Sequence, residues 1–383
     1  MKSGTGATTL TDQVRLSKVA TAAIGGTYLL MGLVVSSYGP LLEHLTLRFG
    51  VSLPVAGATL SVHFAGSLVG VLIAMRSMQK LPARLTVTVA IGLVGLGCGA
   101  AAFAPNWLAF MAAILAIGFG FGGLVLGLNQ VVAYSEGARR AALLNVLNST
   151  YSAGEVVSPV LVAVLAAQHF SLLFIGAVAI SLVLLPGTSG ISGRLPTAAG
   201  VPKRPSPLVL MFIAAVVLYV GIENGTGGWM TTHLESVGLQ TTQAATVTSG
   251  FWLALMTGRL LMTFVPARIP ESAIVLTGSA IAAVALLAAS IGALATVAYI
   301  VAGLFIAPIF PTTIAWLARL HPGDSSTTSW IYPAASIGGT VGPGVIGLII
   351  AGFGVRWAPA VLALVALGML VAFSSAGRLA ARR

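Results

Sequence analysis

The stretch LLNVLNSTYSAGEVVSP, residues 143–159, places a carboxylate in a run that otherwise suits the interior of a membrane. Its polar and helix-bending residues follow one another at steps of three or four: Asn145, Asn148, Ser152, Glu155 and Pro159. On a helix of about 3.6 residues per turn, this spacing puts them along one face. A polar stripe on a helix that crosses lipid needs a functional reason, because polar groups are costly there.

One motif within this stretch is repeated later in the chain. Ser152-x-Gly154-x-x-x-x-Pro159 is matched by Ser336-x-Gly338-x-x-x-x-Pro343. Two other short motifs repeat in the same order. Gly32 followed by His44-Leu45 is matched by Gly221 followed by His233-Leu234, and Pro82-Ala83-Arg84 is matched by Pro266-Ala267-Arg268. Each match links a predicted span to the span six positions later, which indicates an internal duplication.

The composition identifies a membrane protein. Of 383 residues, 57% are hydrophobic and only 7% are charged, whereas about 25% are charged in an ordinary soluble domain. The net charge of +11 is spread thinly through loops, so we expect no nucleic-acid partner. The single cysteine, Cys98, excludes an internal disulfide and a cysteine-built metal site.

Apolar windows predict twelve transmembrane spans, each near the roughly 20 residues that a bilayer requires. They lie near residues 19–45, 51–75, 84–104, 107–134, 140–167, 169–188, 207–235, 242–265, 271–290, 294–318, 325–352 and 356–377. We therefore expect an all-α membrane protein with an N-terminal six-helix bundle (1–188), a cytoplasmic linker (189–206) and a C-terminal six-helix bundle (207–383).

The basic residues predict the orientation. An even number of spans puts both ends of the chain on one side, and nearly all Lys and Arg residues, Arg259 among them, then fall in segments on that side. Only Arg48 and Arg356 fall on the other side. Because basic loops stay in the cytoplasm, we expect a multi-pass protein of the cell (inner) membrane with both termini cytoplasmic.

Glu155 and Glu223 are the two acidic residues well inside predicted spans, whereas Glu43 and Glu235 fall near outer span ends. A charge at the centre of a span costs about 3 kcal/mol, so each midspan acid is a candidate for proton coupling. The alternative is a protonated acid that only packs, and the glycines around Glu223 could mark either close helix packing or a broken helix. His63 is a further candidate, as a proton relay or as a simple hydrogen-bonding group.

Amides, hydroxyls and aromatic rings at comparable depth suit a neutral, polyhydroxylated solute. Hydrogen bonding between helices and anchoring at the membrane interface are the alternatives for these residues. The candidate substrate-binding residues are Tyr28, Asn129, Gln130, Asn148, Tyr151, Asn224, Trp229 and Thr313.

The six-plus-six repeat, basic central linker and cytoplasmic ends together resemble the major facilitator superfamily over essentially the whole chain. The resemblance implies two pseudo-symmetric bundles that rock around a midplane site. Within the superfamily, YVGIENGTGGWMTTHL is similar to the Y-x-G-x-E-x-x-x-G-x-W pattern of the fucose, galactose and glucose:proton symporters. SGFWLALMTGRLL, RRAALLNVLNSTYSAG and IAPIFPTTIA resemble other spans of that group. The acidic residue usual in the loop between spans 2 and 3 is missing from GVLIAMRSMQKLPAR.

The sequence therefore predicts a secondary active transporter, not an enzyme, that couples a sugar or similar small polar metabolite to proton symport. A proton-driven efflux antiporter for drugs or metabolites is the alternative, and a non-transporting membrane receptor or scaffold is a third class. No phosphate-binding loop or metal cluster is present in the sequence. We expect no cofactor, H⁺ as the coupling ion with Na⁺ left open, and a monomer in the lipid bilayer that binds a small-molecule substrate.

Overall fold

The computed structural model describes residues 14–78, 80–135, 140–194, 204–264, 268–321 and 330–381, most of them helical. The first part of the chain forms α1 (Lys18–Phe49), α2 (Leu53–Ser77), α3 (Ala83–Ala102), α4 (Trp107–Ala133) and α5 (Arg140–Leu184). The second part forms α6 (Pro207–Ser236), α7 (Thr241–Leu261), α8 (Glu271–Ala289), α9 (Ala295–Ile306), α10 (Ile309–Leu320), α12 (Ile331–Phe353) and α13 (Ala358–Ala381). Short 3₁₀ turns adjoin these helices: η2 (Leu185–Gly190), η3 (Met262–Phe264), η4 (Gly292–Leu294) and η5 (Val355–Trp357).

Ten helical segments in the described part of the chain are long and apolar enough to cross a membrane. The second arm of α5 counts as one of them, and α9 with α10 counts as another. The predicted spans at 140–167 and 242–265 are not among the ten. The latter corresponds to α7, which is rich in threonine and carries Arg259, and polar residues lower the mean hydropathy of a segment. The chain is thus a helical protein with many membrane spans.

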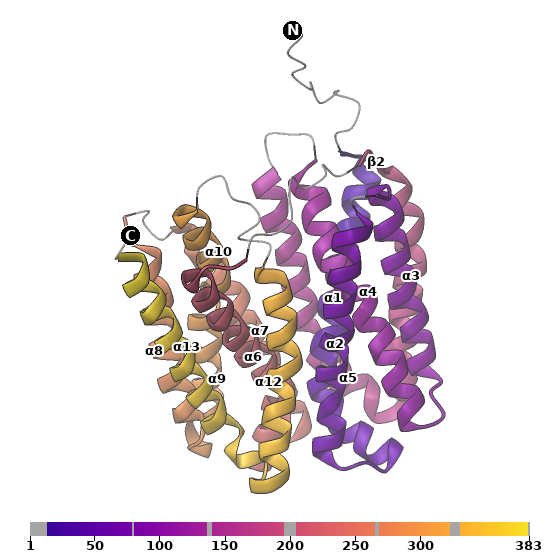
Figure 1. Ribbon diagram of the computed structural model, residues 1–383. Coiled ribbons are helices and arrows are strands. Elements are labelled where there is room, and N and C mark those ends of the chain that lie inside the picture. The colour runs from indigo at the N-terminus through magenta and orange to yellow at the C-terminus, as the bar shows by residue number, and fades with distance from the viewer. Residues whose placement is uncertain are drawn as a thin grey trace.

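The two parts of the chain lie side by side. Figure 1 shows α1–α5 on one side of the molecule and α6–α13 on the other, with the start of α1 and the end of α13 at the same end. We call this end the terminal end and the opposite one the far end. The two sides meet where α1 approaches α6, α2 packs against α12, and α5 packs against α7.

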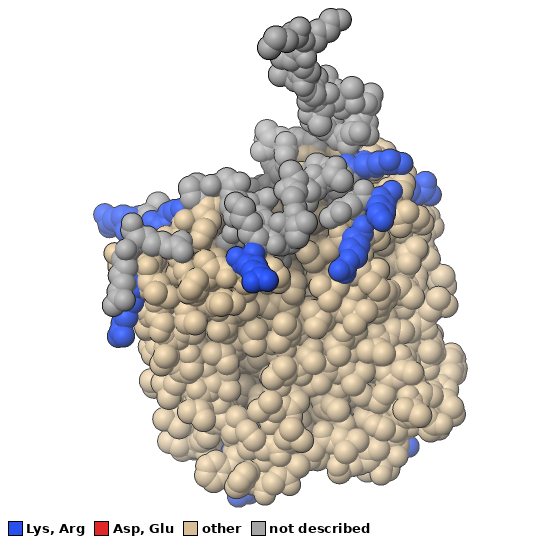
Figure 2. Space-filling model, in the orientation of Figure 1, with Lys and Arg blue, Asp and Glu red and all other residues tan. Residues whose placement is uncertain are grey.

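The surface charge is unevenly distributed along the molecule. On the face that Figure 2 shows, Lys and Arg gather around the terminal end, a few lie at the far end, and the broad band between them shows neither basic nor acidic side chains. Such a band is what lipid tails require of a protein surface. The asymmetry follows the distribution of basic residues that the sequence predicts, apart from Arg259, which is discussed below.

The sequence repeat corresponds to a repeated helix contact. Gly154 of α5 lies against the Leu29 carbonyl of α1, and Gly338 of α12 lies against the Val217 carbonyl of α6. A Cβ at either glycine would overlap that carbonyl oxygen. Small residues let membrane helices approach closely, so the two motifs have the same packing role in the two parts of the chain.

Two interruptions of the helical segments fall at identifiable residues. α5 contains a non-helical residue, His169 (φ −147°, ψ 80°), which separates two arms close to the predicted boundary. The predicted span at 294–318 corresponds to one membrane-crossing segment, Gly292–Leu320, in which a turn at Ala307–Pro308 separates α9 from α10. Proline lacks an N–H group and disfavours a continuous helix. By contrast, α6 is unbroken from Pro207 to Ser236, so its glycines do not interrupt it.

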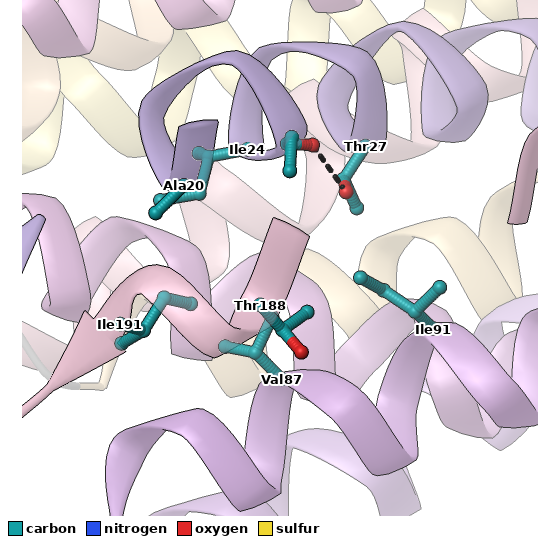
Figure 3. A pocket seen from close by; sticks show the side chains of 8 residues that line it. Ala20, Ile24, Thr27, Val87, Ile91, Thr188 and Ile191 are labelled. Atoms are coloured by element: carbon teal, nitrogen blue, oxygen red, sulfur yellow. Dashed lines mark hydrogen bonds between the residues drawn. The ribbon is translucent and has the colours of Figure 1, made fainter. Parts of the chain in front are cut away.

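A short ribbon closes the terminal end of the first part. β1 (Arg15–Leu16) pairs antiparallel with β2 (Ile191–Ser192), and the Ser17 N–H donates to the Gly190 carbonyl at 3.1 Å. Beneath it, side chains of α1, α3 and the η2–β2 segment face one another, as Figure 3 shows for Ala20, Ile24, Thr27, Val87, Ile91, Thr188 and Ile191. The space between them admits no water molecule. The predicted linker therefore begins in a packed region, and its residues 195–203 lie outside the described residues.

Candidate functional site

Four polar side chains meet where α7 packs against both α5 and α6. The Arg259 Nη2 atom lies 2.8 Å from Glu223 Oε1, and its Nη1 atom donates to Ser152 Oγ at 3.3 Å. Glu155 lies within electrostatic range of both Arg259 and Glu223. We call Ser152, Glu155, Glu223 and Arg259 the junction cluster, because it joins the first part of the chain to the second.

The position of Arg259 corrects a prediction. The distribution of basic residues predicts a cytoplasmic segment for this residue, whereas it lies in the last turn of α7, where its side chain is 27% exposed and forms an ion pair. The cause is that a long arginine stem allows the guanidinium group to reach back along the helix to a buried acid. Arg259 is therefore part of the interior charge pattern and does not report orientation.

Glu155 is almost completely out of contact with solvent. Its exposed fraction is 2%, and Oε2 has no hydrogen-bond partner among the described residues. The hydroxyls of Tyr151 and Ser152 lie within hydrogen-bonding reach of the carboxyl group. Burial of a carboxylate without a partner is far more costly than burial of a neutral carboxylic acid. In this conformation Glu155 is thus shielded from solvent and lies among the polar side chains of Tyr151, Ser152 and Arg259.

The other midspan acid, Glu223, forms an ion pair. Its side chain is 13% exposed and pairs with Arg259, while the Tyr219 hydroxyl one helical turn earlier faces both charges. With every group ionised the junction cluster carries two negative charges and one positive charge. A proton on Glu155 would make the cluster neutral, which suits a buried site.

Hydrogen bonds between α1 and α5 fix the backbone of α5 beside this cluster. Ser36 Oγ of α1 donates to the Glu155 carbonyl at 3.2 Å, and Ser158 Oγ donates to the Leu33 carbonyl at 2.6 Å. Both bonds follow the close contact of Gly154 with Leu29, on its C-terminal side along both helices. These bonds to α1 therefore fix the rotation of α5 about its own axis. In this orientation Ser152, a member of the polar stripe, faces Arg259 of the second part. The side chain of Asn145 lies outside the described residues.

The third predicted proton-coupling residue, His63, lies in a separate aromatic cluster. It is fully buried, its Nδ1 atom lies 3.1 Å from Tyr38 Oη, and Phe64 and Phe121 pack edge-on against its ring. Its Nε2 atom has no partner among the described residues. The hydrogen bond to Tyr38 fits the structural alternative, whereas the relay role stays a prediction.

Most of the predicted substrate-binding amides and hydroxyls bond to their own helices. Asn129, Asn148 and Asn224 each donate one amide hydrogen to the carbonyl four residues earlier, and Thr313 donates its hydroxyl to Ile309. Each amide keeps a second N–H and its carbonyl oxygen for another partner. Asn148 is exposed, Asn129, Gln130 and Asn224 are half-buried, and Thr313 is fully buried. Their role in substrate binding stays a prediction.

The predicted aromatic residues lie in three different settings. Tyr151 belongs to the surroundings of Glu155. Tyr28 is buried, has no hydrogen-bond partner among the described residues, and lies near Tyr332 of the other part. Trp229 is fully buried and donates from Nε1 to the Pro343 carbonyl at 3.1 Å. Trp229 therefore faces neither lipid nor an open cavity.

Trp229 belongs to a second contact between the two parts, which is dry. Its ring fills the space over Gly57 of α2, Gly228 lies beside Leu60, and Gly39 of α1 lies against the Gly227 carbonyl. We call these residues the far-end seal: Gly39, Gly57 and Leu60 from the first part, and Gly227, Gly228 and Trp229 from the second. The glycines of α6 thus permit close helix packing, one of the two alternatives left open by the sequence.

A hollow of 140 Å³ lies away from these contacts, between α1 and both arms of α5. Its lining is mainly leucine, isoleucine and alanine, with Ser37 and Ser158 as polar members whose hydroxyls already donate to backbone carbonyls. It includes neither Glu155 nor Glu223. Among the residues that the structure describes, no group of three or more His, Cys, Asp or Glu side chains could hold a metal ion.

The ion pair of Arg259 with Glu223 and the position of Tyr219 beside this pair were not predicted, although the sequence contains a signal for each. Arg259 is followed by Leu260, Leu261 and Met262, so the apolar run continues beyond the charge. A basic residue inside such a run is a candidate partner for a midspan acid. Tyr219 precedes Glu223 by four residues, which places both on one face of a helix.

Comparison with known proteins identifies the family. The family model of the Major Facilitator Superfamily matches residues 24–271. Protein TsgA of Escherichia coli O1:K1 is 23% identical over 250 residues, which cover 62% of this chain and 63% of that protein. TsgA of the O157:H7 strain EC4115 matches over the same extent, so the chain spans less than two thirds of the length of these relatives.

Solved structures share the fold over almost the whole chain. A bacterial homologue of the human lysosomal transporter Spinster, inward-facing and occupied, has a TM-score of 0.74 at 14% identity and covers 94% of this chain and 96% of that one. A D-xylose–proton symporter has a TM-score of 0.74 at 14% identity over 92% and 96%, and the nucleoside transporter NupG has 0.73 at 15% over 94% and 100%. At such identities these likenesses concern the fold alone. The family match over more than half of the chain establishes that the chain belongs to the Major Facilitator Superfamily, in agreement with its membrane-spanning helices.

Proposed function

We propose that this protein is a monomeric, proton-coupled symporter of a sugar or similar small polar metabolite, with Glu155 as the group that carries the proton. The proposal includes twelve membrane passes in two six-helix bundles, with both termini in the cytoplasm of the cell. The crowding of basic residues at the terminal end supports this orientation. The first arm of α5 and α7 would supply the two passes beyond the ten that are long and apolar enough by composition.

One observation carries the proposal. Glu155 is a buried carboxyl with an unpartnered oxygen, situated where the two parts of the chain meet and within range of an existing ion pair. Glu223 is already neutralised by Arg259 at 2.8 Å, so Glu155 is the acid that needs a proton in this conformation. A contact between two parts that move is the place where loss of that proton has mechanical consequences.

The geometry supplies a simple coupling step. Once Glu155 loses its proton to the solution, its charge competes with Glu223 for Arg259, which already touches Ser152 of the same helix. This would draw α7 toward α5 and weaken the Arg259–Glu223 pair. Protonation of Glu155 would reverse the change, so proton binding and release would bias the arrangement of the two parts.

The solute class is inferred from chemistry and likeness together. Half-buried amides with unused donors and acceptors, at Asn129, Gln130 and Asn224, suit a solute rich in hydroxyl groups. The solved proteins of similar fold include a D-xylose–proton symporter and a nucleoside transporter, whose names give polar solutes. These proteins make D-xylose, D-galactose and uridine the first probes to use.

The test is uptake into proteoliposomes. A thermal-shift screen with D-xylose, D-galactose and uridine selects the solute, because a ligand of the folded state raises the unfolding temperature. We expect an inward proton gradient to drive accumulation of that solute, and a sodium gradient to drive none. Glu155→Gln should abolish accumulation but preserve exchange of labelled for unlabelled solute, because exchange needs no net proton movement.

Glu271→Gln is the matched control, since Glu271 pairs with the exposed Arg319 outside the junction cluster. This variant should accumulate solute like the parent protein. Accumulation by Glu155→Gln at the parent level would refute the role of Glu155. Expulsion of solute under an inward proton gradient would instead support the antiport alternative.

A further inference from the structure

The hollow between α1 and the two arms of α5 has walls that offer nothing to a polar molecule. None of the described residues that line it is charged. Its two polar members, Ser37 and Ser158, already donate their hydroxyls to carbonyls of α1 at 2.7 and 2.6 Å. A buried water molecule needs about two to four polar partners, whereas an apolar cavity of about 150 Å³ in another protein stays dry and binds benzene. The 140 Å³ hollow therefore suits an apolar occupant.

One wall of the hollow is a glycine whose small size no close helix contact requires. Gly176 lies on the second arm of α5, and a Cβ built there meets no atom within 4 Å. At Gly154, on the first arm, a Cβ would instead overlap a carbonyl of α1. Glycine in a helix is destabilising relative to alanine unless its small size is used. At Gly176 the space that the missing side chain leaves free belongs to the hollow.

The hollow lies at the depth of lipid tails and on a lipid-facing side of α5. Among its lining residues Leu161 and Leu172 are 37% and 44% exposed, and Ile175 beside them is exposed as well. Along α1 the lining runs from Leu30 to Ser37, the middle of that helix, and at about 1.5 Å per residue this is about 18 Å from either end. A hydrocarbon core is about 30 Å thick, so acyl chains, and not headgroups, occupy this depth.

We propose that the hollow is a binding site for one acyl chain of a membrane lipid, which inserts between α1 and the two arms of α5 beside Gly176. The chain fills a space that is apolar, uncharged and close to the middle of the bilayer. It lies against the contact of α1 with α5, because Leu33 and Ser158, which are joined by a hydrogen bond, both line the hollow. The inference requires neither proton coupling by Glu155 nor a particular transported solute.

The test is photolabelling of the full chain in nanodiscs that hold one chain each, so that no second copy can cover the hollow. The bilayer is phosphatidylglycerol with a phosphatidylcholine that carries a diazirine in the terminal half of one acyl chain. Val34, Phe174 and Ala177 line the hollow but are buried, so a lipid tail labels them only from inside it. We expect tandem mass spectrometry to find labels on these three residues as well as on Leu161 and Leu172. Labels confined to the two exposed leucines would show that lipid only surrounds the protein, and would refute the proposal.

A series of substitutions at Gly176 connects the labelling to the hollow. Gly176→Ala, Gly176→Val and Gly176→Leu fill the space stepwise, starting from a Cβ that meets nothing. Labelling of the three buried residues should fall along the series and be lost in Gly176→Leu, while the exposed leucines stay labelled.

Gly352→Leu is the matched control. Gly352 is exposed like Gly176 and a Cβ there also meets nothing within 4 Å, but it belongs to α12, whereas α1 and α5 form the hollow. This variant should be labelled like the parent protein. Labelling of the buried residues that does not decrease from Gly176→Ala to Gly176→Val, or that is lost in Gly352→Leu, would overturn the assignment of the site.

Discussion

The two parts of the chain meet through two contacts that differ in chemistry. In the junction cluster, Arg259 reaches both Glu223 and Ser152, and charged groups are held by a few directional bonds. In the far-end seal, glycines and one buried tryptophan are packed without room for a larger side chain. A charged contact can exchange partners at little cost in shape, whereas a packed contact is either formed or separated. The cluster is therefore suited to sense a proton, and the seal to define a closed state.

The largest effect should come from removal of the cation in the junction cluster. Arg259→Met leaves Glu223 buried without a partner, and loss of one member of a buried ion pair costs about 3–5 kcal/mol. We expect a marked fall in unfolding temperature in detergent and loss of transport. The double variant Glu223→Gln with Arg259→Met should regain most of the stability but not the transport. Equal destabilisation by the single and double variants would show that the pair does not compensate buried charge.

A smaller effect should follow from steric change at the seal. Gly39→Ala places a methyl group on the Gly227 carbonyl only when the far end is closed, and such overpacking costs about 1–3 kcal/mol. The ratio of closed to open molecules should fall about 5- to 150-fold, as measured by the distance between spin labels on Leu47→Cys and Thr242→Cys in the full chain with Cys98→Ala. Gly92→Ala in α3 is the matched control, because a Cβ there meets nothing within 4 Å. Similar distance distributions for both variants would contradict a closed state defined by this contact.

Trp229→Phe should affect the seal more mildly. It removes the Nε1 hydrogen bond to the Pro343 carbonyl and part of the ring over Gly57. A lost hydrogen bond that leaves a buried acceptor costs about 1–2 kcal/mol. The free energy of unfolding should fall by this amount while proton-driven uptake continues. Complete loss of solute binding in this variant would instead assign the indole to the substrate site.

The smallest effect is expected at Ser152. Its Oγ accepts one long hydrogen bond of 3.3 Å from Arg259, so Ser152→Ala should cost less than about 1 kcal/mol in stability. Because this bond crosses between the two parts, the variant should alter the pH dependence of uptake more than the unfolding temperature. Ser158→Ala, which removes a bond within the first part, is the matched control and should leave that pH dependence unchanged.

Much of the fold could be predicted because lipid imposes a simple rule on sequence. Apolar runs of the required length identified the helices, and the repeated Ser-x-Gly motifs identified equivalent contacts at Gly154 and Gly338. The break between α9 and α10 was missed, although Pro308 stands at that point in the sequence. A proline in a span permits a break without requiring one, because neighbouring helices can satisfy the freed backbone groups.

The site was predictable in part for the same reason. The cost of a midspan charge indicated Glu155 and Glu223, but the partner of each depends on which helices adjoin. Arg259 is assigned to Glu223 by the packing of α7 beside α6 and α5, which local sequence does not encode. The burial of Trp229 was likewise not predictable from local sequence, since only the contact with α2 distinguishes a buried tryptophan from one at the lipid interface.

The small ribbon of β1 and β2 also determines how the two parts are tethered. It fastens the chain to the first part up to Ser192, and α6 begins at Pro207. Fourteen residues separate these two positions in the sequence, a stretch that at about 3.5 Å per residue could extend to roughly 50 Å. The covalent linkage therefore keeps the two parts together, while the contacts between their helices set the angle between them.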